Sequence, residues 1–298
     1  MASFKPNPPN PKPDRQGRTG RRAKRLVGVG AKWVASAAIT LVALFPVWWM
    51  VNIVFAPPGA ALALSPRLVP TSWSAGVGHI VTVMTDGVFA RAMANSFMFA
   101  GSQSLITLFI ASLAAYCFAH LRFPGRAALF AFSLVGLMVP LGVIVLPTQR
   151  IVSGLGWLNS VQGLVIPLTA SAFALFLLTE YMRAVPKELI EAATVDGVGK
   201  FGIYWRIALP LTRNGLLAVG ILVCVMAWSN FLWPLVTVTK PGLYPVSVAA
   251  ATYFNPQSKF TTGDMMAAAL LSALPLIVVY GLLQRWIVDS ISRAGLRG

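Results

Sequence analysis

The sequence predicts an all-α integral membrane protein with six transmembrane helices and both termini in the cytoplasm. Of its 298 residues, 57% are hydrophobic and only 11% are charged, whereas an average soluble domain carries about 25% charged residues. The hydrophobic residues gather in blocks of about twenty, the length that crosses a bilayer as a helix. Most of the 24 lysines and arginines stand before or between these blocks, as topogenic charges do in membrane proteins.

Six apolar blocks supply the predicted helices. They cover residues 34–55, 96–119, 127–147, 161–180, 216–238 and 267–284. At about 1.5 Å per residue, each can cross a hydrocarbon core about 30 Å thick. The first block follows a basic segment, as in a signal peptide, and Ala61-Leu62-Ala63 matches an A-x-A cleavage site. It is longer than a typical h-region of about 7–15 residues, so we expect a membrane anchor, with cleavage after Ala63 as the alternative.

The lysines and arginines of the connections predict the orientation. With the N-terminus inside, 19 of them are cytoplasmic: nine in residues 1–32, two after the second block, five after the fourth and three after the sixth. The outer segments hold five, namely Arg67, Arg91, Arg150, Lys240 and Lys259. Since cytoplasmic loops carry the excess of positive charge, both termini are predicted to be cytoplasmic. Residues 1–32 lack apolar periodicity and are expected to form a disordered basic tail.

Several functions are excluded by what the sequence contains. The net charge of +16 is accounted for by topogenic placement, so no nucleic-acid binding is expected. No catalytic motif is present, and Gly199-Lys200 does not form a phosphate-binding loop because Phe201 stands where Ser or Thr is required. The cysteines, Cys117 and Cys224, stand singly inside apolar blocks and indicate neither a metal site nor a disulfide framework.

Ionisable side chains are placed at the ends of the apolar blocks. None lies deep inside a block, which argues against a proton-coupled carrier because such carriers place ionisable groups within the membrane. His79 and His120 have no carboxylate or cysteine partner at ligand spacing, so both are expected to be isolated surface or interfacial histidines.

The connection covering residues 186–210 predicts a helical elbow. Pro186 suits the first turn of a helix, and Glu191 is near that N-terminus, where the helix dipole favours negative charge. Gly197 can take the left-handed conformation that ends a helix. On this first helix, Ala192 and Ala193 are expected to be exposed and to allow close approach of a partner.

A second short helix is expected after Gly197. Its spacing predicts an amphipathic face toward the membrane interface, formed by Phe201, Tyr204, Trp205 and Ala208. Pro210 is expected to stop this helix before the next span.

The elbow resembles the E-A-A-x3-G-x9-I-x-L-P loop of bacterial importer permeases. Glu191-Ala192-Ala193, Gly197 and Ile207-x-Leu209-Pro210 match this pattern at its full spacing. The resemblance extends over about residues 34–298 and indicates the MalG-type carbohydrate permeases of binding-protein-dependent ABC importers. Further matching stretches are Asn95-Ser96, Leu121-Arg122-Phe123-Pro124-Gly125-Arg126, Tyr253-Phe254-Asn255-Pro256-Gln257, Ser272-Ala273-Leu274-Pro275 and Gln284-Arg285-Trp286.

This resemblance implies a MetI-like ABC importer permease core in a bacterial inner membrane. In that family the loop forms a coupling helix that docks on a cytoplasmic ATPase, and the implied interface residues are Glu191, Ala192, Ala193, Asp196 and Gly197. The implied partners are a second homologous permease subunit, a homodimeric ABC ATPase and an extracytoplasmic sugar-binding protein. ATP and Mg²⁺ would be bound by the ATPase, and this chain would hold no cofactor and no metal.

The composition of the first 32 residues, together with this resemblance, predicts four parts of the chain. Residues 1–32 form the tail, 33–90 the first transmembrane helix with a periplasmic segment, 91–285 the transmembrane core with its coupling loop at 186–210, and 286–298 a cytoplasmic C-terminal tail.

Candidate substrate-path residues are aromatic or neutral and polar, as sugar sites are. They are Gln103, Trp228, Ser229, Asn230 and Trp233, and helix–helix packing is the alternative role for each. The family tends to show Trp-Asn in the fifth span, whereas Trp228-Ser229-Asn230 moves the amide by about 100° around a helix. In related importers the outer loop before the last span reaches toward the binding protein. Here the corresponding candidates are Tyr253, Phe254 and Asn255.

The predicted function is therefore a permease subunit that forms half of the pore of an ATP-driven sugar importer, with an oligosaccharide as the expected substrate. A polyol or a glycerol-phosphate compound is the alternative substrate. A secondary carrier is a second alternative, but it would usually show inverted repeats or intramembrane charges. A membrane-embedded enzyme is a third, but the sole acidic cluster, Glu180, Glu188, Glu191 and Asp196, is explained by the elbow.

Overall fold

The computed structural model describes the backbone of residues 15–57, 69–255 and 259–295, and the side chains of residues 32–57, 69–255 and 259–282. The chain divides into two compact units, residues 1–51 and 52–298. Every regular element in the described ranges is a helix, which confirms the predicted all-α class. Ala63 and Pro256-Gln257 lie outside the described residues.

The first unit consists of most of helix α1 (Arg15–Val54), which continues through Pro46. Its part Lys32–Val54 is 23 residues long and apolar enough to cross a membrane. Side chains 32–47 are exposed, as expected for a helix that faces lipid. The helix begins at Arg15, inside the segment 1–32 for which the composition predicts a disordered tail. Because the apolar block already forms a helix, extending it toward the N-terminus avoids the cost of a new nucleus.

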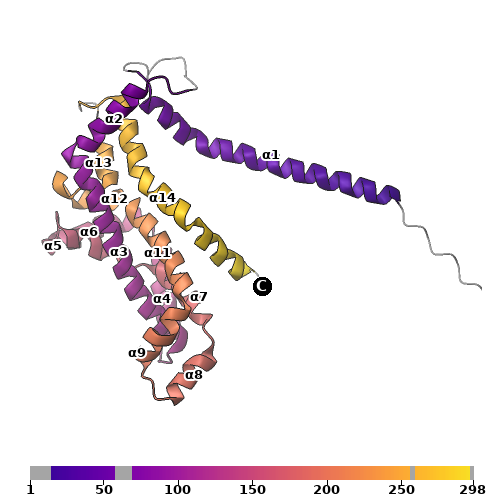
Figure 1. Cartoon of the computed structure of the whole chain (residues 1–298). Helices are drawn as coiled ribbons and strands as arrows, with labels where there is room; N and C mark the ends of the chain where they lie inside the picture. The colour runs from indigo at the N-terminus through magenta and orange to yellow at the C-terminus, as the bar shows by residue number, and fades with distance from the viewer. Residues whose placement is uncertain (1–14, 58–68, 256–258, 296–298) are drawn as a thin grey trace, which may run out of the picture. The chain divides into compact units, whose positions relative to one another are not determined.

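The centre of the second unit is helix α3 (Gly87–His120). It packs against α7 (Ala172–Arg183) and α11 (Arg213–Trp228), and the three helices lie side by side in Figure 1. Small side chains of α3 are buried in this contact, among them Ala111, Ser112 and Ala115. Helices in a bilayer associate through van der Waals contact, and small residues let their backbones approach closely.

Three of the predicted spans are bent pairs of helices. α4 (Arg126–Leu134) with η2 (Val135–Leu137) meets α5 (Leu141–Gly154) at 100°, and α6 (Val161–Val165) with η3 (Ile166–Leu168) meets α7 at 49°. α9 (Lys200–Ile203), η4 (Tyr204–Ala208) and α10 (Leu209–Leu211) together meet α11 at 78°. The described residues thus contain three helices that can cross a membrane, or up to six if each bent pair is one span.

Three predicted apolar blocks do not form one helix each: 127–147, 216–238 and, at the bend into α7, 161–180. Block 127–147 turns at Pro140, whose extended backbone (φ −62°, ψ 137°) precedes α5 and which has no N–H to continue a helix. Block 216–238 leaves the helix at Trp228, and α12 (Leu232–Thr237) is a separate short helix. Asn230 stabilises this second break because its Oδ1 accepts the backbone N–H of Trp233 at 3.3 Å.

The remaining elements lie toward the two ends of the second unit. α8 (Lys187–Val195) is at one end, and α2 (Trp73–Thr85) and α13 (Val246–Thr252) are at the other (Figure 1). η5 (Pro241–Leu243) precedes α13, and α14 (Thr262–Gly295) follows it, with Thr262–Leu282 as its apolar span.

Both histidines have a partner, which corrects the expectation that they are isolated. His79 Nδ1 lies 2.8 Å from Asp264 Oδ1 and so joins α2 to α14. His120 Nε2 lies 2.8 Å from the backbone oxygen of Met182 and joins α3 to α7. Sequence spacing does not reveal such pairs, because 185 residues separate His79 from Asp264.

The contact between α7 and α11 predicts a sharp effect of one methyl group. Gly215 of α11 is buried against the ring of Tyr181, and a Cβ at this position would overlap that ring. We expect Gly215→Ala to destabilise the folded chain by about 1–3 kcal/mol and to lower the melting temperature in detergent by several degrees. Gly101→Ala is the matched control, since no atom lies within 4 Å of a Cβ built there. Equal melting temperatures for the two variants would contradict this packing.

Candidate functional site

The elbow covering residues 186–210 is built as two helical arms around Gly197. The first arm, α8, follows Pro186 and ends with Gly197 at φ +78°. The N–H of Val198 donates to the oxygen of Ala193 at 2.9 Å, and the N–H of Gly197 donates to that of Thr194 at 3.1 Å. These two hydrogen bonds form a Schellman motif, which confirms the prediction that Gly197 ends the helix in the left-handed conformation.

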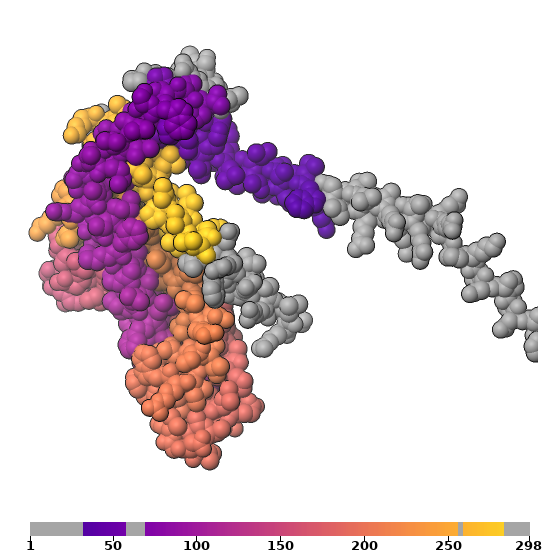
Figure 2. Space-filling model, in the orientation of Figure 1, coloured from indigo at the N-terminus to yellow at the C-terminus, as the bar shows by residue number. Residues whose placement is uncertain are grey.

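The outward surface of α8 combines acidic, small and aliphatic side chains. Glu191, Ala192 and Asp196 are exposed, and the side chain of Val195 is 87% exposed. Figure 2 shows this elbow at the free end of the second unit. Ala193, by contrast, is only 7% exposed and packs within its own chain beside Ile203 and Tyr204. The expectation that Ala193 is exposed is wrong, because it lies on the inner side of α8.

The second arm differs from the predicted amphipathic helix. Phe201 and Trp205 are exposed, but Tyr204 and Ala208 are fully buried. Residues 204–208 form a π-helix in which the N–H of Leu209 donates to the oxygen of Tyr204. Pro210 lies within the helical run rather than stopping it. Pro210 has no N–H for the carbonyl of the preceding turn, and the wider π turn lies directly before it. Tyr204 is buried against Ser112 and Tyr116 of α3.

A groove of about 390 Å³ lies farther along the bundle, beside the bends of the broken spans. It is lined mainly by apolar side chains of η2, α5, α7 and α11, and its polar lining side chains are Gln103, Ser171 and Asn230. Ser171 already caps α7, since its Oγ accepts the N–H of Ala174 at 3.2 Å. Neutral amides and a hydroxyl on an apolar wall can bind an uncharged polar solute.

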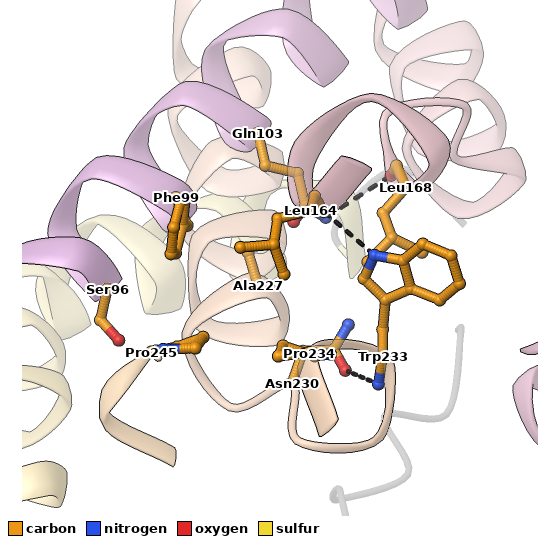
Figure 3. Close-up of a pocket in the computed structure, with 10 residues that line it drawn as sticks. All are labelled: Ser96, Phe99, Gln103, Leu164, Leu168, Ala227, Asn230, Trp233, Pro234 and Pro245. Carbon is orange, nitrogen blue, oxygen red and sulfur yellow. Dashed lines mark hydrogen bonds between the residues drawn. The ribbon is translucent and has the colours of Figure 1, made fainter. Parts of the chain in front are cut away.

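A second, smaller cavity adjoins the groove. It measures about 20 Å³, room for about one water molecule. Gln103 and Asn230 line both cavities. Figure 3 shows Asn230 beside Trp233, together with the hydrogen bond that Gln103 Nε2 donates to the oxygen of Leu168 at 3.5 Å. These two amides are the candidate path residues that the fold brings together.

The other candidate path residues have different surroundings. Trp233 borders the small cavity, but it is 1% exposed and its Nε1 donates to the oxygens of Gly163 and Leu164, each at 3.2 Å. Trp228 turns toward α14, where its Nε1 donates to the oxygen of Ser272 at 3.1 Å. Ser229 is exposed and lines neither cavity. Trp228 and Ser229 therefore line neither of the two cavities that Asn230 lines.

The three candidate residues of the outer segment differ in their exposure. The Tyr253 side chain is 1% exposed, stacks on Phe260 at 4.1 Å and donates its hydroxyl to Asp86 Oδ2 at 2.6 Å. Burial and the nearby Asp86 carboxylate raise the pKa of the Tyr253 phenol, so it keeps its proton and donates. Phe254 is 49% exposed, and Asn255 is exposed. A direct contact from Tyr253 to a docked protein is thus unavailable in this structure, whereas Phe254 and Asn255 are accessible.

Among the residues that the structure describes, no group of three or more His, Cys, Asp or Glu side chains could hold a metal ion.

Residues 107–293 match the family model described as binding-protein-dependent transport system inner membrane component. The chain belongs to this family, whose members are permease subunits of the inner membrane and not enzymes.

Similar proteins agree with this assignment. The chain is 34% identical to the sn-glycerol-3-phosphate transport system permease protein UgpE of Yersinia enterocolitica, over 72% of this chain and 75% of that protein. It is 25% identical to the arabinooligosaccharides transport system permease protein AraQ of Halalkalibacterium halodurans, over 89% and 95%. A solved bacterial ABC transporter chain involved in alginate import shares the fold, with a TM-score of 0.79 at 20% identity, over 89% of this chain and 97% of that one.

Proposed function

We propose that this permease subunit forms half of the translocation pore of an ATP-driven sugar importer and couples to the ATPase through the elbow. The observation that carries the proposal is the outward surface of α8, where Glu191, Ala192, Val195 and Asp196 are exposed at the free end of the bundle. Within a single chain, an 87% exposed valine beside a small residue and two carboxylates has no evident structural role. A partner with an apolar groove and basic side chains fits it.

Ala193 and Gly197 have different roles in this proposal. Ala193 packs α8 onto its own bundle and positions the outward surface without touching the ATPase. Gly197 provides the turn that joins the two arms, and because it is exposed it remains a proposed interface residue. ATP and Mg²⁺ are bound by the homodimeric ABC ATPase.

The proposed orientation places both termini and the elbow in the cytoplasm. The distribution of lysine and arginine between the spans supports it, since the elbow connection carries five and the outer segments carry five in total. The four-part division of the chain keeps its proposed boundaries, with α1 beginning within the tail segment.

A second, homologous permease subunit is the proposed cover of the groove. α4 and η2 have no buried residue in the isolated chain, and η2 forms part of the groove wall. In the proposed pore, Gln103 and Asn230 face the solute, while Trp233 supports the wall and Trp228 and Ser229 lie outside the path.

An oligosaccharide is the proposed substrate. AraQ is named for arabinooligosaccharides, and the polar side chains of the groove are neutral. Glycerol phosphate or a related polyol is the second candidate, because UgpE, 34% identical, is named for sn-glycerol-3-phosphate. The sugar-binding protein is proposed to dock outside the membrane against Phe254 and Asn255, with Tyr253 holding that segment in place from below.

Cysteine labelling tests the orientation. In a background without Cys117 and Cys224, Val195→Cys expressed without the ATPase should react rapidly with a membrane-impermeant maleimide in inside-out vesicles and slowly in right-side-out vesicles. Ala193→Cys, at a 7% exposed position, should react slowly in both. Rapid reaction of the Val195→Cys thiol from outside would overturn the cytoplasmic placement of the elbow.

A bulky cation on the elbow tests the coupling. We expect Ala192→Arg to lower sugar-stimulated ATPase activity and transport about tenfold or more, as substitutions at the centre of an interface do. The measurement uses the importer co-purified with its partners and reconstituted in proteoliposomes. Ala184→Arg is the control, because Ala184 is also exposed but precedes the elbow. If both variants retain wild-type coupling, α8 is not the docking helix.

A truncation in the outer segment tests the proposed docking of the binding protein. Phe254→Ala should raise the concentration of loaded binding protein that half-saturates ATPase stimulation, by about three- to tenfold. Maximal stimulation should be retained at high concentration. Val69→Ala, another exposed apolar position in an outer segment, should leave this concentration unchanged. An unaltered titration for the Phe254 variant would remove Phe254 from the proposed interface.

A further inference from the structure

A buried polar junction joins the second arm of the elbow to α3. Its side chains are Ser112 and Tyr116 from α3 and Tyr204 from η4, each at most 2% exposed. The Ser112 Oγ and the Tyr204 hydroxyl are 2.8 Å apart, and the Tyr116 hydroxyl donates to the oxygen of Lys200 at 3.1 Å. The Tyr116 and Tyr204 rings are also in contact, with centroids 5.5 Å apart. Two hydrogen bonds and one ring contact therefore meet at one place.

The donor in the Ser112–Tyr204 bond can be assigned. Ser112 Oγ donates to the backbone oxygen of Phe109 at 3.1 Å, and a serine hydroxyl has a single proton. Tyr204 is therefore the donor to Ser112. Each tyrosine hydroxyl of the junction thus donates across the boundary between α3 and the elbow arm, one in each direction.

The location of the junction suits it to transmit movement. α3 is one unbroken helix from Gly87 to His120, and Gln103 of the groove lies nine residues before Ser112, a distance of about 13 Å along the axis. The covalent connections from the elbow lead to α7 and, through the 78° bend, to α11, but not to α3. The junction links the elbow by hydrogen bonds directly to α3, the helix that bears Gln103.

The hydrogen bonds of the junction are directional, whereas apolar packing is not. Apolar contact is non-directional, so an apolar arm can slide along a helix with little loss. Buried hydrogen bonds must keep their geometry, since a buried donor that loses its partner is left unsatisfied away from water. An arm held by two such bonds moves together with α3.

We propose that Ser112, Tyr116 and Tyr204 are positioning residues that convert displacement of the elbow into movement of α3 and of the Gln103 wall of the groove. This inference rests on the proposed coupling function of the elbow. It adds a specific mechanical link that the docking of α8 alone does not require.

Removal of single hydroxyls tests the junction. Tyr204→Phe and Tyr116→Phe keep both rings, so the reconstituted importer should assemble and should melt within a few degrees of the wild type. Each variant should transport about two- to tenfold less sugar per ATP hydrolysed, the factor that corresponds to one net hydrogen bond. Tyr244→Phe is the matched control, since that hydroxyl donates to the oxygen of Thr239 in the outer segment and should leave the ratio unchanged.

A double-mutant cycle and a thiol reporter complete the test. Ser112→Ala with Tyr204→Phe should affect the ratio no more than the larger single effect, because both remove the same bond. The modification rate of the thiol in a Gln103→Cys variant should change when ATP is added. This ATP-dependent change should be smaller in the Gln103→Cys/Tyr204→Phe double variant.

The outcomes separate the two proposals. A wild-type importer without sugar-stimulated ATPase activity or ATP-dependent transport would refute the proposed function. The junction alone would be overturned by a different result in a functional importer. That result is that Tyr204→Phe and Tyr116→Phe transport as much sugar per ATP as the wild type and leave the ATP-dependent change at Gln103→Cys intact. The junction proposal would also be overturned if ATPase activity and transport fell in equal proportion and the melting temperature fell by much more than a few degrees. That result would indicate a structural role.

Discussion

Close packing of α3 against α7 and α11 is the contact on which the second unit depends. Lipid is as apolar as these helices, so their association relies on van der Waals contact rather than on exclusion of water. Ala111, Ala115 and Ala174 are each at most 5% exposed in this contact, and Gly215 lies directly against the ring of Tyr181. The elbow and the groove are both attached to these three helices, so small side chains at the centre determine where both are held.

The backbone sets a second requirement, which explains where the spans break. Within hydrocarbon each N–H and C=O needs a partner inside the protein, so a break is tolerated where protein groups or a cavity satisfy it. Asn230 accepts the N–H of Trp233 after α11 ends, and Ser171 accepts the N–H of Ala174 at the bend into α7. Asn230 and Ser171 also line the groove. The polar character of the groove is therefore a consequence of the broken helices around it.

Polar contacts between distant segments stabilise the two ends of the bundle. His79 with Asp264 and Tyr253 with Asp86 join the outer helices, whereas Tyr116 and Tyr204 join the elbow to α3. Hydrogen bonds also join distant segments in the middle, where Gln103, Trp228 and Trp233 donate to backbone oxygens. Polar contacts at both ends are consistent with a subunit whose two ends meet soluble partners.

The sequence by itself determined the features that depend on neighbouring residues. Apolar blocks predicted the helices, because helix length and hydropathy are local properties. Gly197 predicted the end of α8, because the left-handed conformation favours glycine at that one position. The motif around Glu191 located the elbow and indicated the family.

Only the tertiary structure decided which way side chains face and which segments meet. Ala193 is buried within its own bundle, and Trp228 donates to Ser272 of α14. Tyr204 is buried against Ser112 and Tyr116 of α3. His79 and Asp264 are brought together across 185 residues. Such outcomes depend on contacts between helices that are distant in sequence, and no local period or motif encodes them.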